Sequence, residues 1–521
     1  MSISRLRAAP AIVALALALA VPACTPSEEK VTGMAQQAQQ LLDAGQPAQA
    51  QALILKAVRA RDDLPAVYLV QAHIALALGR RGEAYQAYAN ALSLEATNPE
   101  ALLGAAQTGL GSGHVEEAGE DAAKVLVLNP GQPDALLIQG IIRLVRNDLN
   151  AAIGFADRVL AARPNDSGGL ILKSRALALS GDRAGALALV QQGIKANGPT
   201  LEMSMSLAEL QRGGGDGPAF LAALQRVSAL QPADRDVRFD IAETLYKLGR
   251  TDDARREVAG LLDEQIADPA ELGRFARLWN GYDRDALTPE QIAHVADKAA
   301  VDVRLAVARY FIATGRAQAA AAILKPLDTG WSIEVRALAA RAQAALGQGA
   351  AAIAAADQVI AKDPDNGDAL LIKAQAALAG GDPAGAVIAY QRVIRDYPQW
   401  DEGYLGLARA YAADRKPAGV RRAFEDGRAA APQSLPIAAA YVAALPGLGD
   451  PAHAAEVARQ FALASPALPK GWQLYAGTCG GSGDPGCRAE AADGLAAARR
   501  RFGLDLPPGT PPPVALIGRL S

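Results

Sequence analysis

The sequence contains few of the residues on which most enzymatic chemistry depends. Only three cysteines and four histidines occur among 521 residues, and aromatic residues make up 5% of the chain. The four histidines are far apart, at positions 73, 114, 294 and 453, so the sequence offers no metal-ligand cluster. No P-loop, dinucleotide-binding glycine pattern or Gly-x-Ser-x-Gly motif occurs in a strand–turn–helix setting. We therefore expect no catalytic residues, no metal and no cofactor.

The residues that are abundant favour helices. Half of the chain is apolar, alanine is frequent, and alternating runs rich in Val, Thr and Tyr are nearly absent. We predict an all-α protein. The formal net charge is −3 and no long basic run occurs, so we expect no nucleic acid partner. The densest basic segment, Arg499-Arg500-Arg501, is interpreted as positive charge near the end of a helix.

The N-terminus has the pattern of an export signal. Arg5 and Arg7 precede an apolar run from residue 11 to residue 21, about half the ~20 residues that a membrane span needs. The following Val21-Pro22-Ala23-Cys24 resembles the lipobox of bacterial lipoproteins, with Val and Pro at places where other residues are commoner. The resemblance implies removal of residues 1–23 and acylation of Cys24, whereas ordinary signal-peptidase cleavage after Ala23 is the alternative.

The lipobox resemblance also implies a location. Position 25 is Thr, not the aspartate that retains enteric lipoproteins in the inner membrane. We therefore expect a protein anchored by its N-terminal lipid to the periplasmic side of the outer membrane, with residues 24–30 as a short tether.

A period of 34 residues runs through residues 31–268. Small residues recur at two places in each period, and a glycine or asparagine recurs at a third. The small columns are Ala38, Ala72, Ala106, Gly140, Ser174, Ala208, Ala242 and Ala50, Ala84, Ala118, Ala152, Ala186, Ala254, with Phe220 as the exception in the second column. The turn column is Gly45, Gly79, Gly113, Asn147, Gly181, Gly215 and Gly249.

Each column has a physical reason. Glycine, or less often asparagine, ends a helix in the left-handed conformation, so the turn column predicts a chain reversal. Small residues on the two helices of a hairpin allow the helices to pack closely. Phe220 breaks this rule, so we expect its hairpin to be splayed or shifted, and the glycine-rich segment 213–217 before it to be a flexible joint.

These columns resemble the tetratricopeptide repeat family, whose small residue at position 8, alanine at position 20 and proline at position 32 fall on the same places. The resemblance covers nearly all of the chain after the export signal, although position 4, often Trp in the family, is Trp only at Trp472. It implies a right-handed α-solenoid of about fourteen hairpins.

The period divides the chain into segments. After a degenerate hairpin over 269–300, a second block covers 301–468, with turn residues Gly315, Gly347, Gly381, Arg415 and Gly449. A capping hairpin is predicted over 469–502, and a proline-rich tail over 503–521. Cys479 and Cys487 flank the loop of the capping hairpin. Export to an oxidising compartment favours a disulfide between them, and a two-cysteine metal site is the weaker alternative.

By analogy with the family, the first helices line a concave groove and position 9 faces it. We expect the following position-9 residues to be candidates for protein binding: His73, Gln107, Arg175, Glu209, Glu243, Arg309, Arg341, Gln375 and Arg409. Position 5 is apolar in most repeats. It forms either the floor of the groove or the packing between neighbouring hairpins.

The function that these observations favour is a non-catalytic scaffold that binds other envelope proteins through its groove. The weak resemblance to lipoproteins of this family that accompany exopolysaccharide and PEP-CTERM protein-sorting systems implies a role in exopolysaccharide or protein export. One alternative is a groove that guides a polysaccharide, which the scarcity of aromatic residues disfavours. The other is an envelope enzyme with a polar cluster in the degenerate hairpin, at Trp279, Tyr282, Asp283 and Asp285.

Overall fold

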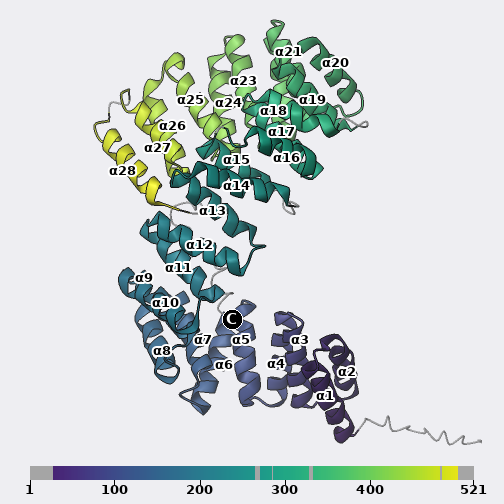
Figure 1. The fold of residues 1–521 in the computed structure, drawn as a ribbon, viewed down its shortest axis with the longest axis vertical. Helices are drawn as coiled ribbons and strands as arrows, with labels where there is room; N and C mark the ends of the chain where they lie inside the picture. The colour runs from purple at the N-terminus through teal and green to yellow at the C-terminus, as the bar shows by residue number, and fades with distance from the viewer. Residues whose placement is uncertain (1–26, 265–269, 284, 328–331, 482–483, 503–521) are drawn as a thin grey trace, which may run out of the picture. The chain divides into compact units, whose positions relative to one another are not determined.

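The computed structural model describes residues 27–264, 270–283, 285–327, 332–481 and 484–502 (Figure 1). Within these ranges the protein consists of 28 α-helices and two 3-10 helices, and no strand is present. None of the described helices is long and apolar enough to cross a membrane. The predictions for Cys24, the tether up to residue 26 and the proline-rich tail lie outside the described residues.

The helices follow one another as hairpins, so odd-numbered helices are first helices and even-numbered helices are second helices. The first helices are α1 (Glu28–Asp43), α3 (Pro65–Ala77), α5 (Pro99–Gly111), α7 (Pro133–Val145), α9 (Ser167–Leu179), α11 (Leu201–Gly214), α13 (Arg235–Lys247), α15 (Ala270–Tyr282), α17 (Val301–Ala313), α19 (Ile333–Ala345), α21 (Gly367–Ala379), α23 (Asp401–Ala413), α25 (Leu435–Ala444) and α27 (Pro469–Thr478).

The second helices complete the hairpins. They are α2 (Pro47–Ala60), α4 (Arg81–Leu94), α6 (Val115–Leu128), α8 (Leu149–Ala162), α10 (Arg183–Asn197), α12 (Gly217–Leu230), α14 (Thr251–Asp263), α16 (Pro289–Lys298), α18 (Ala317–Leu324), α20 (Gly349–Ile360), α22 (Pro383–Asp396), α24 (Pro417–Ala430), α26 (Pro451–Ala464) and α28 (Cys487–Arg500). The 3-10 helices are η1 (Lys325–Leu327) and η2 (Pro446–Leu448).

The predicted turn column is confirmed. All twelve of its residues have a positive φ, including Asn147 at 58° and Arg415 at 54°. In the hairpin of α3 and α4, the Gly79 N–H donates to the Leu76 carbonyl at 2.9 Å, and the Arg80 N–H donates to the Ala75 carbonyl at 2.8 Å. This pair of bonds satisfies the free carbonyls at the end of the first helix, so one left-handed residue is enough to reverse the chain.

The small columns form the contact between the two helices of a hairpin. Ala72 and Ala84, for example, are both fully buried. At Ser174 the contact is direct, because its hydroxyl donates to the Ala186 carbonyl at 3.1 Å. Helix packing at this short distance requires side chains no larger than those of Ala and Ser.

The expected flexible joint at 213–217 is wrong. Gly213 and Gly214 lie within α11, and Gly215, with φ 72°, makes the same left-handed turn as the other hairpins. Phe220 is fully buried on α12. Its burial depends on a residue from the far end of the chain, which is described below.

The structure divides into two compact units, with the boundary between Leu172 and Lys173 inside α9. Unit 1 contains α1 to α8, and unit 2 contains α10 to α28. Unit 2 ends in a hairpin whose helices α27 and α28 are joined by a disulfide between Cys479 and Cys487, with a Cα–Cα distance of 5.6 Å.

Arg415 is the one turn residue that is neither Gly nor Asn, and we predict that Arg415→Gly stabilises the protein. A left-handed conformation costs a non-glycine residue roughly 1–2 kcal/mol, and the entropy of glycine in the unfolded chain offsets part of that gain. We expect a gain of about 0.5–1 kcal/mol in urea unfolding. The opposite change, Gly381→Ala at φ 82°, should destabilise. Loss of stability in Arg415→Gly would contradict this account of the turn.

Candidate functional site

Three adjoining cavities open on the inner face of unit 2, and we call them together the inner groove. The first, of about 730 Å³, is lined by α17, α19, α21, α23, α24 and α25 and includes Arg341, Gln375 and Arg409. The second, of about 630 Å³, lies between two first helices, α13 and α15, and the segments that lead into α23, α25 and α27. The third, of about 360 Å³, shares Glu402 with the first and Asp401 with the second, so the three form a continuous surface.

The wall of the first cavity is mainly apolar. Ile312, Leu405, Val420 and Phe424 line it together with seven alanines from α17, α19, α23 and α25. Small side chains on neighbouring first helices leave room for another chain to approach the backbone closely. Such a surface suits an extended or helical peptide with aliphatic side chains.

Two of the predicted groove arginines are bound by carboxylates of the protein itself. Arg341 donates to Asp368 at 2.9 Å and to Glu402 at 2.5 Å, and its side chain is only 5% exposed. Arg309 donates to the other oxygen of Asp368 at 2.7 Å and lies over the Trp400 ring, 5.0 Å from its centre. The network joins α17, α19, α21 and α23, so these arginines hold the groove together.

The protonation of this network follows from the same contacts. Burial alone would raise the pKa of Asp368, but the charges and hydrogen bonds of Arg341 and Arg309 outweigh it, and the pKa is lowered. Burial would lower the pKa of Arg341, but Glu402 and Asp368 raise it. Both groups therefore stay charged, and the buried pairs stay intact, at neutral pH.

Arg409 and Gln375 differ from these arginines. Both side chains are exposed in the first cavity. The Arg409 Nε donates to the Leu405 carbonyl at 3.3 Å, and within the described residues no carboxylate lies within 4.0 Å of its guanidinium. Of the predicted position-9 residues in the inner groove, Arg409 and Gln375 are the ones that remain available to a ligand.

Several predicted residues pair with the residue one repeat away in the same column. In unit 1, the His73 ring lies 3.4 Å from the Gln39 side chain, one repeat earlier in the column. It also lies 2.9 Å from Glu100, which is outside the column at the start of α5, whereas Gln107 is exposed. In unit 2, Arg175 and Glu209 are 3.5 Å apart. These contacts link successive first helices, so much of the polar row stabilises the stacking of hairpins.

Glu243 lies at the second cavity and is also engaged. It accepts a hydrogen bond from the Tyr282 hydroxyl at 3.0 Å and forms an ion pair with Lys247 at 3.2 Å.

The apolar position-5 row contains both buried residues and residues that line the groove. Ala337 and Leu371 are fully buried between hairpins, whereas Leu405 lines the first cavity.

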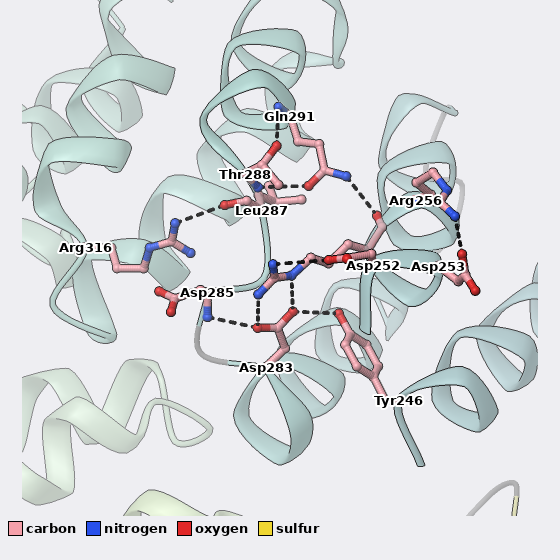
Figure 2. Close-up of polar contacts among 11 residues, drawn as sticks. Tyr246, Asp252, Asp253, Arg256, Asp283, Asp285, Leu287, Thr288, Gln291 and Arg316 are labelled. Atoms are coloured by element: carbon pink, nitrogen blue, oxygen red, sulfur yellow. Dashed lines mark hydrogen bonds and ion pairs between the residues drawn. The ribbon is translucent and has the colours of Figure 1, made fainter. Parts of the chain in front are cut away.

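The polar cluster of the degenerate hairpin has a structural role (Figure 2). The buried Asp283 carboxylate follows α15 and accepts hydrogen bonds from Arg255 at 2.8 and 2.9 Å and from the Tyr246 hydroxyl at 3.2 Å. Burial would raise the pKa of Asp283, but Arg255 outweighs it, and the pKa is lowered. Trp279 is 2% exposed. The buried carboxylate of Asp283, through its ion pair with Arg255, therefore positions the start of the loop that follows α15.

Among the residues that the structure describes, no group of three or more His, Cys, Asp and Glu side chains is placed to hold a metal ion.

The repeat and its geometry agree with a known family. A family model described as tetratricopeptide repeat matches residues 103–167 and 338–399, one segment in each block of the period. The chain is a tetratricopeptide repeat protein. Proteins of this family are generally non-catalytic scaffolds that bind other proteins. No curated protein matches the chain.

Solved structures match parts of this repeat protein. PilW, a widely conserved type IV pilus biogenesis factor, is 19% identical over 40% of this chain and 96% of its own, with a TM-score of 0.35. The thermophilic protein TTC0263 of Thermus thermophilus is 23% identical over 35% of this chain and 99% of its own, with a TM-score of 0.32. The P58(IPK) repeat domain is 19% identical over 74% of this chain and 99% of its own, with a TM-score of 0.24.

The sequence interpretation missed the acidic half of the groove. None of the four acids Glu402, Asp368, Asp401 and Asp240 is among the site residues predicted from the sequence. Asp368 in fact bridges two first helices, and Asp401 and Asp240 line the second cavity. The repeat columns contain a signal for these ion pairs. Arginines recur at position 9 of some hairpins, and acids recur at position 2, the second residue, of later hairpins.

We predict that the loss of the Asp401 proton lowers the stability of unit 2 as the pH rises. Burial raises its pKa to about 6, although a hydrogen bond with Ser434 opposes the shift. The folded state therefore binds more protons than the unfolded state between pH ~4 and ~6, and stability falls across that window and then levels. The melting temperature of Asp401→Asn minus that of the natural protein should therefore increase as the pH rises across the same window.

Asp401→Glu is the matched control, because it keeps the charge and should retain the dependence on pH. An equal difference in melting temperature between Asp401→Asn and the natural protein at pH 4 and pH 7.5 would contradict the prediction.

Proposed function

We propose that this repeat protein is a non-catalytic scaffold whose inner groove receives an extended or helical segment of another protein. The observation that carries the proposal is the first cavity, where an apolar wall surrounds Arg409, a cation without a carboxylate partner among the described residues. The matching ligand is a segment with aliphatic side chains and at least one acidic residue.

The second part of the proposal concerns location: a lipid on Cys24 anchors the protein to the periplasmic side of the outer membrane, where it supports an envelope assembly such as exopolysaccharide or protein export. The charged and apolar pattern of residues 1–23 supports export. The pairing of Cys479 with Cys487 is consistent with an oxidising compartment.

Charge reversal in the groove tests the binding proposal. We predict that Arg409→Glu reduces partner capture at least tenfold, because a carboxylate would face the acidic residue of the ligand, while the fold stays intact. The measurement is recovery of crosslinked proteins from envelope extracts, with circular dichroism to monitor folding.

Arg422→Glu is the matched control for this experiment. Arg422 belongs to the same unit, its side chain is 81% exposed, and it lies outside the cavity linings. Equal capture by the Arg409 and Arg422 variants, or recovery of polysaccharide in place of protein, would count against the proposed ligand.

Membrane fractionation tests the location. We predict that the natural protein sediments with outer membranes and carries acyl mass on its first residue, whereas Cys24→Ser loses both because it has no thiol to acylate. Cys479→Ser should keep the membrane location and serves as the control. An unmodified N-terminus at Thr25 or Cys24 in the natural protein would contradict lipidation, and free thiols at Cys479 and Cys487 without reduction would contradict export.

A further inference from the structure

Phe220, the one large residue in its small column, is buried against the C-terminal end of the described chain. Its ring centre lies 5.7 Å from that of Phe502, and Phe502 is itself only 5% exposed. Phe502 is the second residue after α28, so the end of the described part of unit 2 returns to α12 near its start. The exception in the repeat is therefore explained by a contact between the two ends of unit 2.

The turn before α12 is shaped to accept Phe502. A Cβ at Gly217, the first residue of α12, would lie 2.6 Å from the Phe502 ring and 2.9 Å from the flexible end of Leu248. A Cβ at Gly215 would lie 3.2 Å from the Arg500 carbonyl oxygen. The absence of side chains at these two glycines lets the end of α28 approach the backbone of the turn.

A buried lysine completes this contact. The Lys247 side chain is 2% exposed, and its ammonium lies 5.6 Å from the centre of the Phe502 ring. It donates a hydrogen bond to the Arg501 carbonyl and pairs with Glu243 at 3.2 Å. Because a buried ammonium must be paired, the Arg501 carbonyl satisfies a group that would otherwise be costly to bury.

A second contact closes unit 2 nearby. The Lys470 ammonium donates to the Asn280 carbonyl at 2.8 Å, and Leu468 reaches within 2.9 Å of the place that a Cβ of Gly281 would occupy. Asn280, Gly281 and Leu468 all line the second cavity of the inner groove. Lys470 lies in the first turn of α27, and α28 ends at the first contact. The disulfide of the capping hairpin joins the end of α27 to the start of α28.

We propose that residues 500–502 and Lys470 form a latch by which the capping hairpin closes unit 2 over its own inner groove. Few side chains make the two contacts, and both lysines donate to neutral backbone carbonyls, so the capping hairpin can release while the preceding hairpins remain folded. Release widens the second cavity and admits a bulky segment. The regulatory role rests on the proposed function of the groove, but the latch itself does not.

A double-mutant cycle tests the Phe502 contact in the full-length protein. Gly217→Ala should displace Phe502, and Phe502→Ala should remove it, so each variant should speed tryptic cleavage after Arg501 at least tenfold. The double variant should be no faster than Phe502→Ala alone, because the added methyl group then has no ring to meet.

Gly349→Ala is the matched control for the cycle. Gly349 also begins the second helix of a hairpin two residues after a left-handed glycine, and no atom lies within 4 Å of its Cβ position. Its cleavage rate should match that of the natural protein. Equal rates in Gly217→Ala and Gly349→Ala, or full additivity in the double variant, would overturn the latch contact.

Opening of the groove is measured at Ala276→Cys, where the second and third cavities adjoin. Its thiol should react with a maleimide on a 5-kDa polyethylene glycol at least tenfold faster when Phe502→Ala is added, while its rate with N-ethylmaleimide changes little. Ala418→Cys, on the exposed surface of α24, should react equally in both backgrounds. Faster cleavage after Arg501 without faster labelling at Ala276→Cys would show a frayed end and overturn the latch.

These readouts need no ligand, so they remain informative if no partner binds. Suppose that neither the natural protein nor Phe502→Ala captures any protein, while Ala276→Cys is labelled faster when Phe502→Ala is added. That result would contradict the proposed function and leave the latch standing. If both forms capture the same amount of protein although Ala276→Cys is labelled faster with Phe502→Ala, the regulatory role is overturned.

Discussion

The reversal of the chain at a single left-handed residue is the constraint on which this structure depends. Twelve hairpins turn at a residue of positive φ, and in each the second helix begins two residues later. A turn this short restricts how the two helices approach each other, so the residues that face across the hairpin are mostly small, with Phe220 as the exception. Such a hairpin cannot bury its apolar faces alone, and its neighbours in the stack complete the burial.

The periodic part of the fold could be predicted because its causes are local. Gly79 is required by the turn beside it, and Ala72 and Ala84 by the helix that each one faces. The fate of Phe220 could not be predicted in the same way. Its neighbour Phe502 lies at the other end of unit 2, and no period connects the two positions.

The candidate site shows a similar division. Three residues of the position-9 column, Arg341, Gln375 and Arg409, line the first cavity, because the repeat geometry sets which side of a first helix faces it. The column could not show which charges were already neutralised. Arg341 reaches Asp368 and Glu402 on two later first helices, so its pairing depends on the stacking of three hairpins. The charged row thus includes residues that are exposed in the groove and residues that hold the hairpins together.

The degenerate hairpin shows how the period can be interrupted without losing the stack. Its loop between α15 and α16 lacks the left-handed glycine, and a polar network takes over the role of the turn (Figure 2). Asp283 ties the start of the loop to Arg255 of the preceding hairpin, and the Leu287 carbonyl accepts a bond from Arg316 of the next at 3.2 Å. Because α15 forms a wall of the second and third cavities, this network fixes part of the groove. The cluster that the sequence offers as a candidate active site therefore shapes the groove through the helix that it positions.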